Sequence, residues 1–129
     1  DPLAIRGRLD VDAGPYWTTH HRFDHLSPPA PKRLGTAAVD HLLINALVPL
    51  RIAMGGVLGR SRMAAGALEL LRQLPAERNV ILRGWEALGI HAHNAARSQA
   101  LIVLHQHACA GRQCLTCGIG QELLKRTSS

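Results

Sequence analysis

The spacing of apolar residues after residue 36 constrains the fold more than any other feature of this sequence. They recur with the period of an α-helix, at Val39, Leu42, Leu43, Ala46, Leu47, Leu50 and Met54. Apolar residues also cover much of the opposite side: Ile44, Val48 and Ile52. A helix that is apolar nearly all round is typical of a buried position. We therefore predict a central helix that begins after the capping residue Thr36, kinks near Pro49 and ends at the glycines of residues 55–59.

Shorter apolar stripes follow, each beside residues that start or stop helices. One stripe comes after Ser61, a candidate N-cap, and consists of Met63, Ala67, Leu70, Leu71 and Leu74. Pro75 separates it from a third stripe, which Gly89 can terminate: Val80, Ile81, Trp85 and Leu88. Asn94 can cap a fourth helix, whose stripe is Ala96, Ala100, Leu101, Val103, Leu104 and Ala108. Because residues 118–125 favour a last short helix, we predict an all-α fold, a compact bundle of four to five helices.

The first 35 residues have a different pattern. Prolines and glycines interrupt any long helix there: Pro2, Gly7, Gly14, Pro15, Pro28, Pro29, Pro31 and Gly35. We therefore predict an extended, non-helical N-terminal arm over residues 1–35, with no helix longer than two turns. A helical domain should occupy residues 36–129, with at least four helices between residues 36 and 126.

Aromatic residues are too few to build the core of that domain. Of the two tryptophans, one tyrosine and one phenylalanine in the chain, three lie in the arm, at Tyr16, Trp17 and Phe23. The core must therefore consist mainly of aliphatic side chains, and 129 residues are enough to form one without disulfide support. We predict one core that contains Leu43, Leu47, Leu50, Leu71, Trp85, Leu101 and Leu104.

The chain is basic, with a formal net charge of +6. A positive balance is typical of proteins that bind nucleic acid or another anionic surface. The arginines are scattered from Arg6 to Arg126, and no run of five basic residues occurs. A basic surface without such a partner is therefore the other interpretation.

No segment predicts a membrane span or a secretory signal. The most apolar stretch, Leu42 to Leu58, is shorter than a span requires and contains Asn45, Pro49 and Arg51. No charged start is followed by an apolar run, and three cysteines within nine residues differ from the disulfide framework of a secreted protein. We therefore expect the reducing cytoplasm. The chain begins with Asp1 rather than Met, as a fragment or a trimmed product would.

Three cysteines near the C-terminus form the clearest chemical motif. Cys109, Cys114 and Cys117 have the spacing C-x4-C-x2-C, and thiolates two residues apart in a turn can face one ion. Neighbouring glycines allow the loop to fold back. A tetrahedral zinc site needs a fourth ligand, and His105 lies four residues before Cys109, on the same face of the predicted helix. We predict a structural zinc knuckle at residues 109–117 with converging sulfurs. His105 is the first candidate for the fourth ligand, and solvent or a group from a missing half of the protein is the second.

Other interpretations of the cysteines stay open. The same spacing begins the plant-type iron–sulfur pattern, whose distant fourth cysteine would have to come from a missing segment or a second subunit. Free cysteines are also small apolar residues that pack without a ligand. A redox dithiol is a further alternative, although no thioredoxin-like βαβ pattern surrounds the motif.

A second group of polar residues lies in the arm, at His20, His21, Asp24 and His25. On a helix, His21 and His25 would share a face and could hold a metal ion, which leaves a metalloenzyme open as an alternative. No general acid or base accompanies these residues, so we prefer an exposed arm whose histidines titrate near neutrality. We expect no catalytic residue in this chain, and we expect that the chain alone is not an enzyme.

Two further polar residues have structural explanations. Asn45 places an amide in an apolar helix and must find hydrogen-bond partners, so we expect it to tie the arm to the bundle. Glu77 should lie in the first turn of the third helix, where its charge complements the helix dipole.

Several motifs occur together in an order that resembles a known bacterial family. The most specific are S-Q-A-L-I at residues 98–102 and C-L-x-C-x-I-G at residues 114–120, preceded by P-A-E-R-N at residues 75–79, Trp85 and Gly89. Upstream pieces in the same order are Tyr16-Trp17, His20, Lys32-x-Leu34-Gly35, Ile44-Asn45 and Pro49-Leu50. Beyond residue 15, the chain resembles the bacterial domain-of-unknown-function 2851 (DUF2851) family.

The resemblance implies that the chain is the C-terminal helical half of a longer protein. In longer members, the N-terminal half carries acidic and histidine motifs on expected strands, similar to those of metal-dependent nucleases, so any catalytic site would lie there. The family pattern does not include His105. We therefore predict a non-catalytic helical module that stabilises or docks a larger protein, with the missing N-terminal half or another protein as its partner. The alternative is a nucleic-acid-binding module that accompanies a nuclease-like half.

Overall fold

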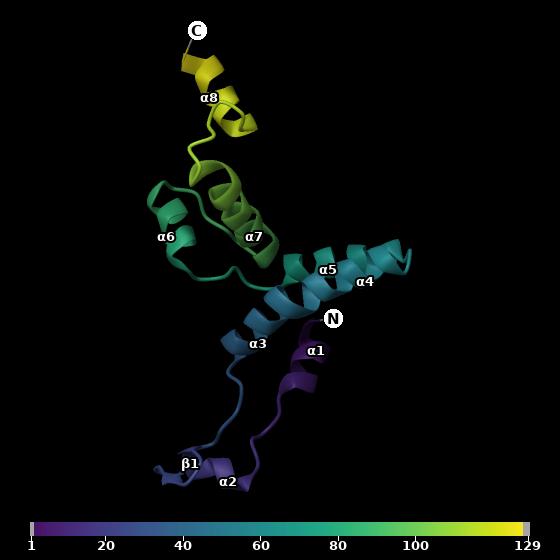
Figure 1. Cartoon of the computed structure of the whole chain (residues 1–129), viewed down its shortest axis with the longest axis vertical. Coiled ribbons are helices and arrows are strands. Elements are labelled where there is room, and N and C mark those ends of the chain that lie inside the picture. The colour runs from purple at the N-terminus through teal and green to yellow at the C-terminus, as the bar shows by residue number, and fades with distance from the viewer. Residues whose placement is uncertain (1, 128–129) are drawn as a thin grey trace. The chain divides into compact units, whose positions relative to one another are not determined.

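The computed structural model describes the backbone of residues 2–127 and, except at residues 2, 3, 123 and 127, their side chains. Helices dominate the fold, which confirms the predicted class (Figure 1). By their contacts the residues group into two units, Asp1–Leu74 and Pro75–Ser129. This division lies between residues 74 and 75, whereas the sequence placed a boundary after residue 35.

The first unit contains a long helix followed by a helical hairpin. Residues 36–57 form one continuous helix, which consists of α3 (Thr36–Leu42), a π-helical turn η1 (Leu43–Leu47) and α4 (Val48–Val57). After a short turn, α5 (Ser61–Gln73) packs along α4 (Figure 1). The predicted central and second helices are thus present.

Two glycines allow this hairpin to close. Gly59 has a φ of +62°, a left-handed conformation that favours glycine. Gly55 is buried, and a β-carbon at this position would lie 3.1 Å from the Arg60 carbonyl oxygen and 3.3 Å from the Met63 Cβ. The two helices therefore approach each other where one of them has no side chain.

The π-helical turn lies next to Pro49, where the sequence predicts a kink. Proline has no N–H, and its ring crowds the carbonyl group four residues earlier. The Val48 N–H donates to the carbonyl of Leu43, five residues earlier, so the helix widens at this point. The exposed side chain of Asn45 donates to the His41 carbonyl oxygen at 3.1 Å, so its own helix supplies a partner.

The starts of these helices differ from the predicted ones by one residue. Gly35 and Arg60 occupy the N-cap positions of α3 and α5, and no side chain caps either helix. Thr36 and Ser61, the predicted caps, are therefore the first residues inside the helices.

The first 35 residues contain more structure than predicted. α1 (Pro2–Leu9) has eight residues, just over two turns at about 3.6 residues per turn, so the prediction of a non-helical arm is wrong there. Proline suits the first turn of a helix, and one glycine does not end it. A short helix α2 (Pro15–Thr18) and an antiparallel hairpin of β1 (His20–Arg22) and β2 (His25–Leu26) complete the arm.

Ion pairs hold the arm in two places. The Arg6 Nη2 lies 2.6 Å from the Asp40 Oδ1, and this pair joins α1 to α3. Asp40 is buried, so the ion pair with Arg6 replaces solvent around its carboxylate. On the exposed side of the arm, Arg33 pairs with Asp12, and this hydrogen bond lowers the pKa of the Asp12 carboxyl.

The second unit contains α6 (Val80–Ala87), α7 (Ala95–Leu104), a π-helical turn η2 (His105–Cys109) and α8 (Gly118–Thr127). The Asn94 side chain accepts a 3.0 Å hydrogen bond from the Arg97 N–H, which confirms the predicted cap of α7. Asn79 caps α6 in the same way. Gly89 follows α6 with a φ of +78°, as expected of a C-terminal glycine.

Each unit has its own buried side chains. The buried apolar residues of the first unit are Val39, Leu43, Ile44, Val48, Ala67, Leu70, Leu71 and Leu74, and those of the second are Leu82 and Ala95. The prediction of one common core is therefore wrong. Trp85 and Leu101 belong to the second unit, and Leu50 is 55% exposed.

Among the described residues, the helix of residues 36–57 alone is long and apolar enough to cross a membrane by length and composition. The stretch from Leu42 to Leu58, considered from the sequence, is too short for a membrane span, but the helix in the structure also includes α3. A core helix of a soluble protein also meets this criterion, but such a helix is mostly buried. Here 28% of the most apolar 18-residue stretch is buried.

Candidate functional site

The three cysteines follow the end of α7. Cys109 is the last residue of η2, Cys114 lies in the turn that follows, and Cys117 immediately precedes α8. All three are free thiols; Cys109 and Cys114 are exposed, and Cys117 is half-buried. The motif therefore forms a loop between two helices, as predicted.

Backbone contacts fold this cysteine loop, residues 109–117, tightly. The Gln113 N–H donates to the Ala108 carbonyl oxygen at 2.8 Å, and the Cys117 N–H donates to the Gln113 carbonyl oxygen at 3.0 Å. A β-carbon at residue 120 would overlap the backbone carbonyl group of Cys114. Gly120 is therefore required where the loop meets the first turn of α8.

His105, the fourth predicted ligand, lies on η2, four residues before Cys109. Its Nδ1 atom is buried and has no hydrogen-bond partner among the described residues. A buried ring nitrogen without a partner is costly, and a metal ion or a donor would relieve that cost. Within the described part of the chain, no three His, Cys, Asp or Glu side chains gather as a metal-binding group. Zinc binding by these four residues and the convergence of the three sulfurs stay predictions.

Two motif segments that are distant in the sequence meet in the second unit. The Ser98 hydroxyl, fully buried, accepts a hydrogen bond from the Glu77 backbone N–H at 3.3 Å and donates to the Ala95 carbonyl oxygen at 3.1 Å. The neighbouring Gln99 amide donates to the Glu77 carboxylate. Glu77 lies before α6 rather than in its first turn, so the expected dipole role is wrong. These residues join a loop to α7 and have a structural role.

The histidines of the arm lie on the β-hairpin rather than on a helix. His20 stacks on Tyr16 with ring centroids 4.0 Å apart, and its Nδ1 lies 2.8 Å from the Tyr16 carbonyl oxygen. His21 lies beside Lys32, with 3.2 Å between a ring nitrogen and Nζ. His21 and His25 therefore do not share the face of a helix, which the alternative of a metal site in the arm required.

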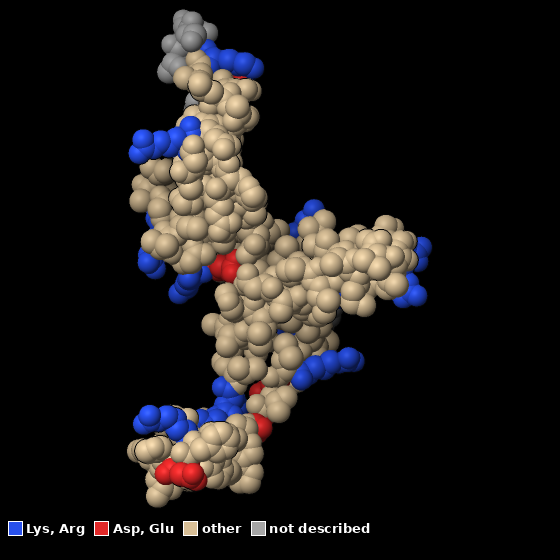
Figure 2. Space-filling view, viewed as in Figure 1, with Lys and Arg blue, Asp and Glu red and all other residues tan. Residues whose placement is uncertain are grey.

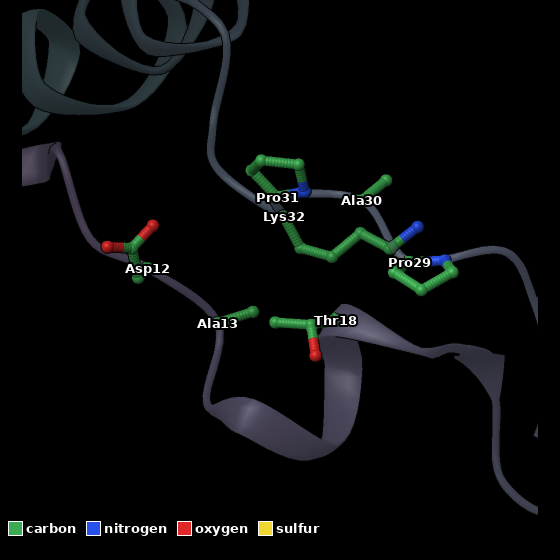
Figure 3. Close-up of a pocket in the computed structure, with 7 residues that line it drawn as sticks. All are labelled: Asp12, Ala13, Thr18, Pro29, Ala30, Pro31 and Lys32. Atoms are coloured by element: carbon green, nitrogen blue, oxygen red, sulfur yellow. The ribbon is translucent and has the colours of Figure 1, made fainter.

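A pocket of about 470 Å³ lies in the arm, where residues 12–13 run beside residues 29–32 (Figure 3). Alanine and proline form most of its wall, and the Lys32 side chain lies along it. The Thr18 hydroxyl at its side donates to the Pro15 carbonyl oxygen of its own helix. This lining contains no nucleophile with an adjacent base, so no reaction follows from it.

The first unit also contains a markedly apolar groove. Its volume is about 450 Å³, and it lies between α1 and the helix of residues 36–57. Seven apolar residues and one arginine line it: Ile5, Arg8, Leu9, Leu42, Leu43, Ala46, Leu47 and Leu50. The groove could not be predicted from the sequence because it depends on α1, which was not predicted either.

Exposed apolar side chains continue the groove along α4. Leu50, Met54 and Val57 are 55%, 43% and 87% exposed, and their spacing of four and three residues places them on one side of the helix. We call the groove residues together with Met54 and Val57 the docking face. In the space-filling view, Lys or Arg side chains lie at the far end of the α4–α5 hairpin, and uncharged side chains cover much of the rest of its visible surface (Figure 2). A helix that is apolar nearly all round is consistent with an exposed docking surface as well as with a buried position.

Comparison with families of known sequence gives one result. The sequence model of a family described as a protein of unknown function (DUF2851) matches residues 2–80, more than half of the chain. The chain belongs to the DUF2851 family. Comparison with curated proteins and with solved structures gave no match.

The DUF2851 match covers the docking face and ends at the start of α6. The upstream motifs of the predicted resemblance, from Tyr16-Trp17 to Pro49-Leu50, lie inside the match. The S-Q-A-L-I and cysteine motifs lie beyond it, so the likeness of these two segments stays a prediction. The apolar groove of this chain therefore lies inside the matched region.

Proposed function

We propose that this DUF2851 chain is a non-catalytic helical module that docks onto a protein partner through its docking face. The observation that supports this function is the exposure of the long apolar helix. Leu42 and Leu50 in the groove and Met54 and Val57 beyond it are all exposed and lie along one side of the long helix. Large exposed apolar surfaces of this kind mark interaction sites in soluble proteins.

The energetics favour an occupied docking face. Moving a fully exposed Leu, Val or Met side chain out of water contributes about 1.5–3 kcal/mol. Several such side chains lie along one side of α4, and the groove adds the apolar side chains of α1. The free energy gained by burying them together can exceed the entropic cost of association, whereas the gain from burying one such residue cannot.

The partner we propose is the N-terminal region of longer DUF2851 proteins. The basis for this choice is the resemblance of the chain to the C-terminal half of such proteins. In that arrangement the helical module would cover apolar surface on the N-terminal region, and each part would stabilise the other. Any nuclease-like chemistry would belong to the N-terminal region.

An association measurement tests this function. The chain and the N-terminal region of a longer family member would be produced as separate polypeptides and titrated by calorimetry. We expect binding, and we expect Leu50→Asp to weaken it about tenfold or more, because a buried leucine is worth about 1.5–3 kcal/mol.

Ile52→Asp is the matched control. Ile52 is 40% exposed on the same helix but lies two residues, or about 200°, round from Leu50. This control should bind like the unaltered chain. Absence of binding, or equal loss in both variants, would contradict the proposed function.

We further propose that zinc stabilises the C-terminal end of the module, with Cys109, Cys114, Cys117 and His105 as ligands. The tight cysteine loop, the free thiols and the buried His105 Nδ1 without a partner support this ligand set. The donor set of three sulfurs and one nitrogen fits zinc, which would crosslink η2 to the start of α8.

Metal removal tests the zinc proposal. We expect a chelator to lower the melting temperature of the chain, and Cys114→Ser to reproduce that loss. Zinc affinity should weaken as the pH falls, because thiolates must lose protons to bind. His107→Ala, an exposed residue of the same turn, is the control. Unchanged melting after chelation would reject the site in favour of unliganded thiols.

The alternative of nucleic-acid binding has less support. Several arginines pair with carboxylates and present less net charge to a phosphate: Arg6 with Asp40, Arg33 with Asp12, Arg72 with Glu69, and Arg126 with Glu122. Binding to DNA or RNA that falls steeply with added salt would favour this alternative instead.

A further inference from the structure

We infer that the docking face receives an amphipathic helix whose apolar side enters the groove and whose acidic flank pairs with Arg8. This inference rests on the proposed docking function and names the part of the partner that docks. It follows from the length of the face, its lining and its charge.

The length of the docking face matches a helix of several turns. The groove residues on the long helix run from Leu42 to Leu50, which spans about 12 Å at about 1.5 Å per residue. With Met54 and Val57 the face extends to about 22 Å along the same axis. A helix of about 15 residues has this length and presents apolar anchors at intervals of three and four residues.

The lining of the groove favours apolar anchors. Seven of its eight residues are apolar, and no backbone edge of a strand contributes to it. An extended peptide would need such an edge for its own N–H and C=O groups, whereas a helix satisfies them internally. The groove therefore suits an occupant that is already helical.

Charge selects an acidic flank on that helix. Arg8 is the charged residue among the eight that line the groove, and it is exposed at the end of α1. Its neighbour Arg6 is held by the buried Asp40, which fixes α1 and so the position of Arg8. The net charge of +6 also disfavours a second copy of this chain as the occupant, because like charges repel.

A pair of synthetic peptides tests the inference. Each has 15 residues and the same leucine anchors at i, i+4, i+7 and i+11; one carries glutamates on its flank and the other lysines. Binding to the whole chain is measured by fluorescence anisotropy. We expect the acidic peptide to bind about threefold or more tightly than the basic one.

Variants of the chain assign the contacts. Arg8→Glu should reverse the preference, Leu50→Asp should weaken both peptides about tenfold or more, and Ile52→Asp should change neither. Circular dichroism of each variant shows that the helices are intact.

Other results overturn the inference. Equal binding of the two peptides, or an Arg8→Glu variant with unchanged preference, would reject the acidic flank. Self-association of the chain, or its co-sedimentation with vesicles of neutral phospholipid in place of peptide binding, would identify a second copy or a lipid surface as the occupant. If the N-terminal region binds and Leu50→Asp weakens that binding while neither peptide binds, the docking function stands and the helical occupant is wrong.

Discussion

Several motif residues of this chain have local packing or hydrogen-bonding roles. Ser98 is fully buried and bonds to the backbone of both Ala95 and Glu77. Tyr16 and His20 stack on each other, and Gly55 lies where two helices touch. In each case the residue type follows from a local packing or hydrogen-bonding need.

Replacing Ser98 with alanine should destabilise the second unit. The substitution removes the hydrogen bonds of the Ser98 hydroxyl with the Glu77 N–H and the Ala95 carbonyl oxygen, and each lost hydrogen bond costs about 0.5–1.5 kcal/mol. Urea unfolding followed by tryptophan fluorescence of Trp85 measures the loss. Ser61→Ala, at an exposed position without a capping bond, is the control and should have little effect. A loss for Ser98→Ala no larger than that of the control would show that these bonds contribute nothing.

The burial of two leucines on the long helix predicts different losses of stability. Leu43 is 1% exposed, so Leu43→Ala should cost about 2–5 kcal/mol. Leu50→Ala should cost less than about 0.5 kcal/mol in the isolated chain, because Leu50 is mainly exposed. Thermal unfolding of both variants compares them directly. A large loss for Leu50→Ala would mean that the chain already covers this part of the docking face by itself.

At the scale of elements, a long-range ion pair positions the helix that forms one wall of the groove. Arg6 and Asp40 are 34 residues apart in the sequence and join α1 to α3. The Asp40 side chain is 10% exposed, so the loss of its partner would leave a poorly solvated charge. The groove therefore depends on this contact.

Asp40→Ala should release α1 from α3. Hydrogen bonds to charged groups contribute about 1.5–3 kcal/mol, so α1 should become sensitive to proteolysis at Arg6 and Arg8 while α4 and α5 stay protected. Limited trypsin digestion with mass spectrometry detects the cuts. Glu69→Ala removes an exposed ion pair and serves as the control. Equal cleavage of the two variants would mean that other contacts hold α1.

The Asp12–Arg33 pair predicts how the arm responds to acid. Arg33 lowers the pKa of Asp12, so the pairing contributes fully above the ordinary carboxyl pKa and is lost as the pH falls through the lowered value. The contacts between residues 12 and 33 should therefore loosen at acidic pH in the unaltered chain. NMR shifts of these residues across a pH titration follow the change. In Asp12→Asn the shifts should no longer show this step, and a step of the same size would assign it to another group.

The sequence predicts elements whose signals are local. Helical spacing located the long helices, and Asn94 and Gly89 marked a start and an end because their effects act within one turn. α1 was missed because its stability depends on Asp40, far along the chain. The groove was missed because α1 forms one of its walls. In addition, periodicity cannot distinguish a face that packs inside the chain from a face left for a partner.

At the scale of the whole chain, burial is concentrated in two separate units. The first holds most of the buried leucines and the docking face, and the family match covers it entirely apart from residue 1. The second holds the loop joined by Ser98 and the cysteine loop. We therefore assign the proposed docking to the first unit and the proposed zinc site to the second.

Hydroxyl-radical footprinting of the chain, alone and bound to the N-terminal region of a longer family member, tests the docking face most directly. We expect oxidation of Leu50 and Met54 to fall on binding, because a partner covers them, and oxidation of Ile52 on the other side of α4 to stay unchanged. A bound complex in which Leu50 and Met54 are oxidised as fast as in the free chain would contradict this expectation.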